Sequence, residues 1–282
     1  MDSAGELRRI FAEGRFRPLK RLGQNFLVDA NVASRIVDAL APARDDVVIE
    51  IGPGLGALTF ELARRVGTLT VVEKDRALCA LLAERLKDEA PRVRLVCGDI
   101  LRADLPLLSG GGRAKVIGNL PYSVTTPIIE YLIESRRFVS RAVLTVQREF
   151  SARLLASPGG KEYGSITCFV RYYAVVTLER QVPRACFYPR PEVDSSVIVL
   201  QMRESPPVDV RDEGLFFAVI RKAFNQRRKT LLNALSSKGM ASLASRESIA
   251  EALASSGIDP RSRAEGLDLD GFARIANALA AG

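Results

Sequence analysis

Five short, almost continuously apolar runs constrain the fold of this chain most strongly. They are VVIEI (47–51), TLTVVE (68–73), VRLVC (93–97), AKVIG (114–118) and AVLTVQ (142–147). Their length and their β-branched residues are typical of strands that are covered on both faces. Apolar residues at helical spacing lie between the first runs, in 56–66 and 76–90. We therefore predict an α/β fold with a parallel, doubly wound sheet.

The pattern changes near residue 160. Residues 164–183 and 195–203 are rich in β-branched and aromatic residues, and we predict longer antiparallel strands there, flanking the proline-rich turn CFYPRPEV (186–193). A linker rich in proline and charge follows at 203–214. Beyond it are helical patterns at 215–224, 227–237, 246–257 and 269–280. We divide the chain into a domain of residues 1–205 and a small α-helical domain of residues 206–282.

Composition and charge exclude several classes of protein. Histidine is absent and the four cysteines lack metal-ligand spacing, which argues against a metal site and against a histidine-activated nucleophile. No apolar run approaches the roughly 20 residues of a membrane span, and the charged N-terminus lacks a signal sequence, so we expect a cytoplasmic location. The net charge of +8 favours a polyanionic partner such as nucleic acid, although it can also serve solubility alone.

A glycine loop follows the first predicted strand. Gly52, Gly54 and Gly56 in EIGPGLGALT allow a tight turn and the close approach of a ligand to the backbone, with a helix N-terminus behind it. Dinucleotide enzymes and methyltransferases both contain such loops, and a purely structural turn is a third interpretation. We take Gly52 and Gly54 as candidate cofactor-binding residues.

Two carboxylates follow the next two predicted strands. Glu73 ends TLTVVE about 20 residues after the loop, where a carboxylate can accept hydrogen bonds from both hydroxyls of a ribose. Asp99 follows VRLVC and is suited to accept a hydrogen bond from the exocyclic amine of adenine. The alternative for each is an acid at a strand end that only meets solvent.

The fourth predicted strand ends in Asn119-Leu120-Pro121-Tyr122. In this order, the loop, the two carboxylates and the tetrad resemble the S-adenosylmethionine-dependent adenine-N6 methyltransferases, which have an Asn/Asp-x-Pro-aromatic tetrad here and a Rossmann-like class I sheet. The chain looks most like the KsgA family of ribosomal RNA adenine dimethyltransferases. The stretches that carry this resemblance are LGQNFLVD (22–29), EIGPGLGALT (50–59), VVEKD (71–75), GNLPYSVTTPII (118–129), VQREFSARLLASPGGKEYGSIT (146–167), VPRACFYPRPEVDSSVIVL (182–200) and AFNQRRKTLLNAL (223–235).

The resemblance implies S-adenosylmethionine as the cofactor, with S-adenosylhomocysteine as its product. Asn25 and Leu27 resemble the N-terminal segment that closes over the cofactor, and Gly52 resembles the loop glycine beside its methionine part. Glu73 and Asp99 take the roles of the ribose and adenine ligands, and Asn119 is implied to touch both cofactor and target. Without the resemblance, LGQNF (22–26) would be interpreted as an ordinary N-terminal arm that packs on the domain.

The tetrad suits the chemistry of methylating an amine. If the Asn119 side-chain oxygen and the Leu120 or Pro121 carbonyl accept the two N–H bonds of adenine N6, the nitrogen lone pair can point at the methyl group. Proline fixes the bend and has no N–H that would compete. Tyr122 is predicted to stack on the extruded base, with Phe187 as a candidate for its opposite face. The alternative is a proline-bent turn with a buried tyrosine.

Basic side chains cluster in two segments that we predict to contact RNA. One is residues 8–21, and the other contains Arg221, Lys222, Arg227, Arg228 and Lys229. The alternative for the second segment is a solvated helix face.

The resemblance implies a substrate, and three other functions compete with it. The implied target is two adjacent adenines in the 3′-terminal hairpin of small-subunit (16S) rRNA within an assembling 30S particle, modified by a monomer. A large-subunit rRNA methylase that confers macrolide-type resistance and a non-catalytic ribosome assembly factor are the alternatives. A dinucleotide oxidoreductase is disfavoured, because the tetrad has no role in hydride transfer.

Overall fold

The computed structural model describes residues 23–88, 93–237 and 244–281, together with Gly5, Glu13, Phe16 and Pro18. Most of the basic segment at 8–21 lies outside the described residues. The chain forms two compact units, one of Met1–Ser151 with Val175–Met202 and one of Ala152–Ala174 with Arg203–Gly282. The domain boundary that we placed after residue 205 lies close to Arg203, where the chain enters the second unit for the last time. The second unit also includes residues 152–174.

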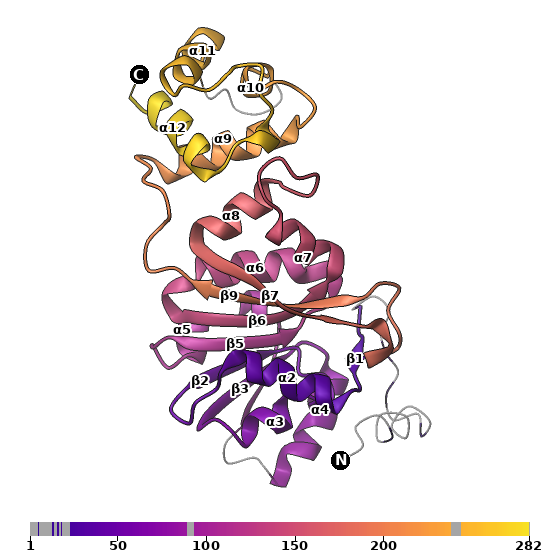
Figure 1. The fold of residues 1–282 in the computed structure, drawn as a ribbon. Coiled ribbons are helices and arrows are strands. Elements are labelled where there is room, and N and C mark those ends of the chain that lie inside the picture. The colour runs from indigo at the N-terminus through magenta and orange to yellow at the C-terminus, as the bar shows by residue number, and fades with distance from the viewer. Residues whose placement is uncertain are drawn as a thin grey trace. The chain divides into compact units, whose positions relative to one another are not determined.

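A seven-stranded sheet forms the centre of the first unit (Figure 1), and its strands occur in the order β4-β3-β2-β5-β6-β9-β7. The strands are β2 (Val47–Ile51), β3 (Thr68–Glu73), β4 (Val93–Cys97), β5 (Ala114–Asn119), β6 (Val139–Gln147), β7 (Ala174–Val182) and β9 (Ser195–Met202). The first five strands of that order pair in parallel, and β9 pairs with β6 antiparallel. The predicted parallel sheet is confirmed.

The register of the parallel strands brings their carboxyl ends to one edge. Ile51 at the end of β2 pairs with Val72 of β3 and with Gly118 of β5. A Cβ atom at Gly118 would lie 2.7 Å from the backbone oxygen of Ile51, so only glycine allows this approach. The strand order reverses between β2 and β5, and ligands of open α/β sheets bind at such a point.

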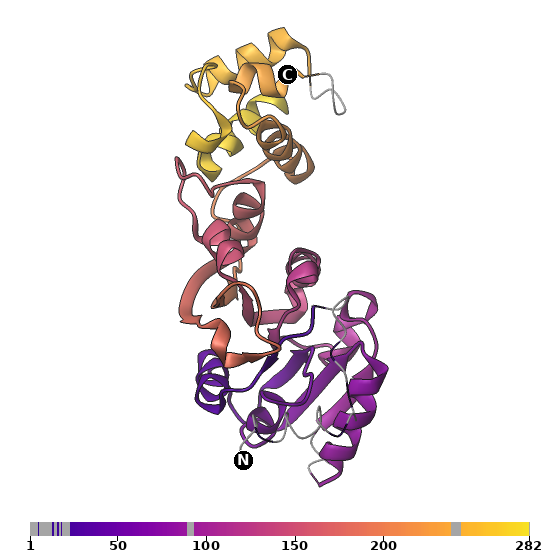
Figure 2. The ribbon, with the colours of Figure 1, turned by 90° about the vertical axis from the view of Figure 1, so that its right-hand side faces the viewer.

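Helices cover the sheet on both sides (Figure 2). Those of the first unit are α2 (Ala30–Leu40), α3 (Thr59–Ala63), α4 (Arg76–Arg85), α5 (Leu105–Leu108) and α6 (Thr125–Glu134), with α7 (Arg148–Leu155) at its boundary. Aspartates begin three of them, because the side chains of Asp29, Asp75 and Asp104 accept hydrogen bonds from first-turn N–H groups of α2, α4 and α5. A small second sheet pairs β1 (Phe26–Leu27) with β8 (Phe187–Tyr188).

The prediction that residues 164–183 form one long strand is wrong in its first half. Ser165–Tyr173 is helix α8, which begins where the Thr167 hydroxyl accepts the N–H of Gly164. Among its buried residues, Cys168 and Tyr172 are four positions apart and Val170 and Tyr173 are three apart, as on one face of a helix. Strand β7 starts only at Ala174.

The second unit is helical and contains α8 with α9 (Glu213–Asn225), α10 (Leu231–Leu235), α11 (Arg246–Ser255) and α12 (Leu269–Leu279). An aromatic cluster joins α8 to α9, where the Tyr172 ring lies 5.1 Å from Phe216 and 5.2 Å from Phe217 between centroids. The predicted C-terminal helices are confirmed. No helix within the described ranges is long and apolar enough to cross a membrane.

Candidate active site

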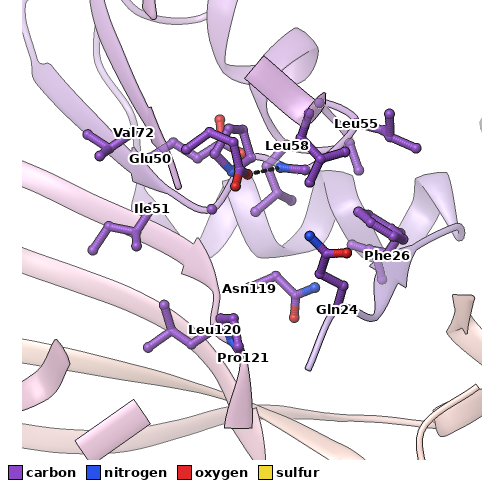
Figure 3. A pocket seen from close by; sticks show the side chains of 18 of the residues that line it. Gln24, Phe26, Glu50, Ile51, Leu55, Leu58, Val72, Asn119, Leu120 and Pro121 are labelled. Carbon is purple, nitrogen blue, oxygen red and sulfur yellow. Dashed lines mark hydrogen bonds between the residues drawn. The ribbon is translucent and has the colours of Figure 1, made fainter. Parts of the chain in front are cut away.

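A cavity of about 740 Å³ opens at the carboxyl edge of the sheet in the first unit (Figure 3). Most of the residues predicted from the sequence line it, namely Asn25, Leu27, Gly52, Gly54, Glu73, Asp99, Asn119, Leu120, Pro121 and Tyr122. Figure 3 shows the Asn119 side chain at the end of β5 beside Gln24 of the N-terminal segment. Phe187 is not among the lining residues.

The glycine loop takes the backbone form that its composition predicts. Gly52, Gly54 and Gly56 all have positive φ angles, of 66°, 58° and 89°. At Gly56 an added Cβ would lie 2.5 Å from the Phe60 ring, so a larger residue would displace that ring. The loop also bonds to the site, because the Gly54 N–H donates to Glu73 Oε2 at 3.2 Å.

Glu73 is held by backbone groups on both of its oxygens. Oε2 accepts from Gly54, and Oε1 accepts from the Asp75 N–H at 2.8 Å. The residue is 6% exposed, and this burial raises the pKa of Glu73 although the two N–H bonds act to lower it. A carboxylate offers about four lone-pair sites, so Glu73 retains capacity to accept a hydrogen bond from a ligand hydroxyl.

Asp99 forms an ion pair that the sequence did not indicate. Lys74 Nζ lies 2.8 Å from Asp99 Oδ2, while the Leu101 N–H donates to Oδ1 at 3.1 Å. Burial acts to raise the pKa of Asp99, but these two contacts outweigh it and the pKa lies below the usual value. Asp99 is therefore a charged acceptor at the cavity wall, with Lys74 as its partner.

Glu50 is a buried acid of the cavity that the sequence analysis did not select. It is 1% exposed on β2, and its Oε2 accepts a hydrogen bond from the Thr59 hydroxyl at 2.7 Å. Burial, against the lowering effect of the Thr59 hydrogen bond and with a smaller raising effect of the nearby Glu73, brings the pKa of Glu50 up to about 8. A glutamate inside the apolar run VVIEI was the signal available in the sequence.

The Asn119 amide is oriented by the N-terminal segment. Its Nδ2 donates to the backbone oxygen of Asn25 at 2.8 Å, so the Oδ1 atom is the end that can accept a bond from a ligand. The Asn25 side chain donates to the Gly23 oxygen, and Gln24 Nε2 donates to Asp75 Oδ2 at 2.9 Å. The segment is therefore tied to both strand ends.

The backbone after Asn119 distinguishes the two carbonyls proposed as acceptors. The Pro121 oxygen already accepts from the Val124 N–H at 3.1 Å and from the Thr125 hydroxyl at 3.3 Å. Tyr122 is half-buried, and its hydroxyl lies 2.8 Å from the hydroxyl of Ser195 on β9. Burial raises the pKa of Tyr122, so this phenol is neutral at ordinary pH.

Phe187 does not lie where the sequence analysis placed it. Its side chain is 4% exposed and belongs to the core cluster of the first unit, together with Leu27, which it faces across the β1–β8 pair. It therefore presents no ring face to a ligand in this structure. The next residue, Tyr188, is 45% exposed and is the aromatic side chain that β8 presents at the surface.

The five basic residues predicted for RNA binding differ in exposure. Arg221, Arg228 and Lys229 are exposed. Lys222 is 4% exposed because it falls on the inward face of α9, so its assignment as a phosphate contact is corrected. Arg227 Nε forms an ion pair with Glu265 at 2.7 Å and its other nitrogen donates to the Gly160 oxygen, which directs this side chain into the second unit.

A disulfide beside the cavity was also not predicted. Cys79 of α4 and Cys97 at the end of β4 are bonded, and they join the elements that follow Glu73 and precede Asp99. Cys168 is a free, buried cysteine of the second unit. Across the described ranges no group of three metal-ligating side chains was found.

The sheet order, the glycine loop and the carboxylates at the strand ends define a Rossmann-like methyltransferase fold. The sequence profile described as "Ribosomal RNA adenine dimethylase" matches residues 15–281. The chain belongs to this family.

Curated relatives and solved structures agree with this assignment. The ribosomal RNA small subunit methyltransferase A of Moorella thermoacetica is 50% identical over 271 residues, which are 93% of this chain and 92% of the relative. The protein of the same name from Geobacillus thermodenitrificans is 45% identical and covers 98% of this chain and 95% of its own. The 23S rRNA methyltransferase ErmE superposes with a TM-score of 0.70 at 25% identity, covering 91% of this chain and 100% of its own.

A solved dimethyladenosine transferase from Plasmodium falciparum has the same fold. It superposes with a TM-score of 0.77 at 24% identity, over 88% of this chain and 94% of the other.

The pKa of Glu50 makes stability depend on pH. The folded-state value of about 8 lies above the ordinary 4.5, so between these pH values the unfolded chain releases a proton that the folded chain keeps. Stability therefore falls as the pH rises through this window. The Glu50→Gln variant keeps an acceptor for Thr59 without titrating. We expect it to match the parent near pH 5 and to exceed it near pH 8 by on the order of a few kcal/mol in chemical denaturation.

Glu130→Gln is the matched control, because Glu130 is an exposed carboxylate on α6. It should leave the pH dependence of unfolding unchanged. A stability difference between Glu50→Gln and the parent that stays constant from about pH 5 to pH 8 would contradict the assignment.

Proposed function

We propose that the chain transfers methyl groups from S-adenosylmethionine to N6 of two adjacent adenines in the 3′-terminal hairpin of small-subunit rRNA, giving N6,N6-dimethyladenine during subunit assembly in the cytoplasm. The observation that carries this is the orientation of Asn119. Its Nδ2 is used by the Asn25 backbone oxygen at 2.8 Å, which leaves its Oδ1 as an acceptor at the cavity. An acceptor there suits an amine substrate.

The lining of the main cavity fits a nucleoside cofactor. Glu73 would accept from the ribose hydroxyls, Asp99 from the adenine amine, and Gly52 and Gly54 would let the methionine part approach the backbone. Asn25 and Leu27 would cover it from the N-terminal segment. When bound, the cofactor supplies a methyl group on a positively charged sulfur. Because Glu50 is largely neutral near pH 7, the pocket holds fewer like charges than its count of acids suggests.

Two acceptors of the tetrad would position the target amine. We assign one to Asn119 Oδ1 and the other to the Leu120 carbonyl, because the Pro121 carbonyl already accepts two bonds. Together they hold the N6 hydrogens so that the nitrogen lone pair faces the methyl group. The methylated nitrogen is acidic enough to lose a proton to water or to one of these oxygens, so the mechanism requires no dedicated base.

Tyr122 would hold the target base by stacking. Its hydroxyl is anchored to Ser195 at 2.8 Å, which restricts rotation of the ring at the cavity wall. A restrained aromatic ring loses little entropy when a base stacks on it. The neutral phenol also adds no charge near the positively charged methyl donor.

The percentage of sequence identity to the relatives favours small-subunit rRNA as the substrate. Two relatives named as small-subunit methyltransferases are 50% and 45% identical to this chain, whereas the large-subunit enzyme ErmE is 25% identical. We assign methyl transfer to the domain of residues 1–205. The domain of residues 206–282 would contribute to RNA binding, with Arg221, Arg228 and Lys229 as its exposed cations.

Asn119→Ala tests the proposed chemistry. Removing the amide takes away one acceptor for the target amine, and we expect kcat to fall by roughly 100-fold or more, since losing one positioning hydrogen bond has effects of this size. Methyl transfer from labelled cofactor would be measured, alongside cofactor binding and thermal unfolding. Ser123→Ala is the control, because Ser123 lines the same cavity without an assigned role. Turnover near the parent level in Asn119→Ala would refute the mechanism.

The choice of substrate can be tested with labelled S-adenosylmethionine and two RNA sources. We expect N6,N6-dimethyladenine in undermethylated small subunits and no label in naked large-subunit rRNA. Label in the large-subunit RNA alone would favour the resistance-methylase alternative. Cofactor binding without transfer to either RNA would favour a non-catalytic assembly factor.

The exposed cations of the second unit should make RNA affinity depend on salt concentration. Replacing Arg221, Arg228 and Lys229 by glutamine should weaken RNA binding and make the slope of log affinity against log salt shallower by up to about 3. Binding to undermethylated subunits would be measured over a range of salt concentrations.

The control for this change removes three exposed arginines of the first unit, Arg44, Arg76 and Arg137, which alters net charge equally. An identical slope change in both variants would show that total charge, rather than the basic segment at 221–229, sets the affinity.

A further inference from the structure

A second cavity of about 500 Å³ lies beside the main cavity in the first unit. The two share a wall formed by residues 23–25 and Tyr122, while the opposite side of the second cavity comes from Gln147 and residues 188–193. The proposed reaction at Asn119 leaves this cavity without a role. We propose that it binds the base of the nucleotide next to the adenine under methylation, stacked on Tyr188, an inference that rests on the proposed function.

Tyr188 has the exposure that a stacking residue needs. It is 45% exposed. Among the described residues, the large hydrophobic side chains that are exposed are Leu107, Val175, Leu178 and Tyr188, and Tyr188 is the aromatic one. It also lines the second cavity. Stacking of a base on an aromatic ring changes affinity by roughly 5- to 100-fold and tolerates any base, because each has a flat π face.

The backbone that carries Tyr188 is fixed on the first unit. Tyr188 pairs with Phe26 in the β1–β8 ladder, and the Val28 N–H donates to the Cys186 oxygen at 2.9 Å. The loop that follows is held by Arg184, whose backbone N–H donates to Asp194 Oδ1 and whose guanidinium donates to the Glu192 oxygen, both at 3.0 Å. The ring is therefore presented by a preorganised loop.

The shared wall suits a strand with two neighbouring bases. Tyr122 lines both cavities, and its hydroxyl contact with Ser195 holds it in place between them. A base in the main cavity and a base in the second cavity would then lie on either side of one anchored residue. A substrate with two adjacent adenines can occupy both cavities at once.

The charges and amides of the second cavity favour a base over a phosphate. Arg190 and Glu192 are both exposed lining residues, so their opposite charges offset each other at the rim. Gln147, at the end of β6, presents an amide that can donate to and accept from a base edge. Gln24 lines the cavity too, but its Nε2 is bonded to Asp75.

This arrangement would also let a modified nucleotide stay bound between the two rounds of methylation. Stacking on Tyr188 uses the ring face and needs no N6 hydrogen, so an adenine that is already dimethylated can occupy the second cavity while its neighbour is modified. The order in which the two adenines react would then not change which residues hold them.

Binding measurements with synthetic RNA test this proposal independently of catalysis. A short, end-labelled single strand with adjacent adenines would be compared, by fluorescence anisotropy with S-adenosylhomocysteine present, with versions in which either adenine is abasic. We expect Tyr188→Ala to weaken binding of the intact strand by roughly 5- to 100-fold. At one of the two positions, an abasic site should weaken binding to the parent protein by the same factor as Tyr188→Ala does. The same abasic site should not weaken binding to Tyr188→Ala any further.

Two variants separate stacking from loss of structure. Tyr188→Phe keeps the ring and should bind like the parent, and Leu178→Ala removes another exposed apolar side chain of the first unit and should change nothing. Unchanged affinity of Tyr188→Ala for the intact strand would overturn the proposal. It would also be overturned if, at both positions, the abasic site weakened binding to Tyr188→Ala by the same factor as it weakens binding to the parent. If the abasic site has no further effect on Tyr188→Ala but the protein methylates no adenine, the proposed binding site stands and the proposed function is overturned.

Discussion

The close parallel approach of β2 and β5 is the constraint on which the site depends. The Ile51 backbone oxygen occupies the space that a side chain at position 118 would need, so the pairing of Ile51 with this position requires glycine. This contact places Gly52, which begins the loop on the cofactor side, beside Asn119 on the substrate side. A shift of one residue in this pairing would turn every side chain of β5 to the other face of the sheet and would separate the two halves of the cavity.

Local signals in the sequence were sufficient for the parts of the site that this pairing assembles. Continuous apolar runs mark strands buried on both faces, and the carboxyl ends of parallel strands necessarily share an edge. Glu73, Asp99 and Asn119 could therefore be expected to lie together before their distances were known. The glycine loop was equally legible, because positive φ angles require residues of this kind.

Features that depend on distant parts of the chain were missed. Residues 165–173 have strand-like composition, but packing of Tyr172 against Phe216 and Phe217 accompanies a helix there. Phe187 and Tyr188 are neighbours on a strand, and pairing with Leu27 and Phe26 decides which ring is buried. Glu50 could have been suspected from its place in the apolar run VVIEI, whereas the burial of Lys222 and the Lys74–Asp99 ion pair depend on how side chains from separate segments meet.

The bond from Asn119 to the Asn25 backbone has a consequence for which side chains this position tolerates. Related tetrads begin with either asparagine or aspartate, which have the same shape and both offer an acceptor to an amine. In this chain an aspartate would set a carboxylate oxygen against the Asn25 oxygen, because the donated hydrogen would be missing. The choice of amide over acid is thus made by the protein's own N-terminal backbone, before any substrate arrives.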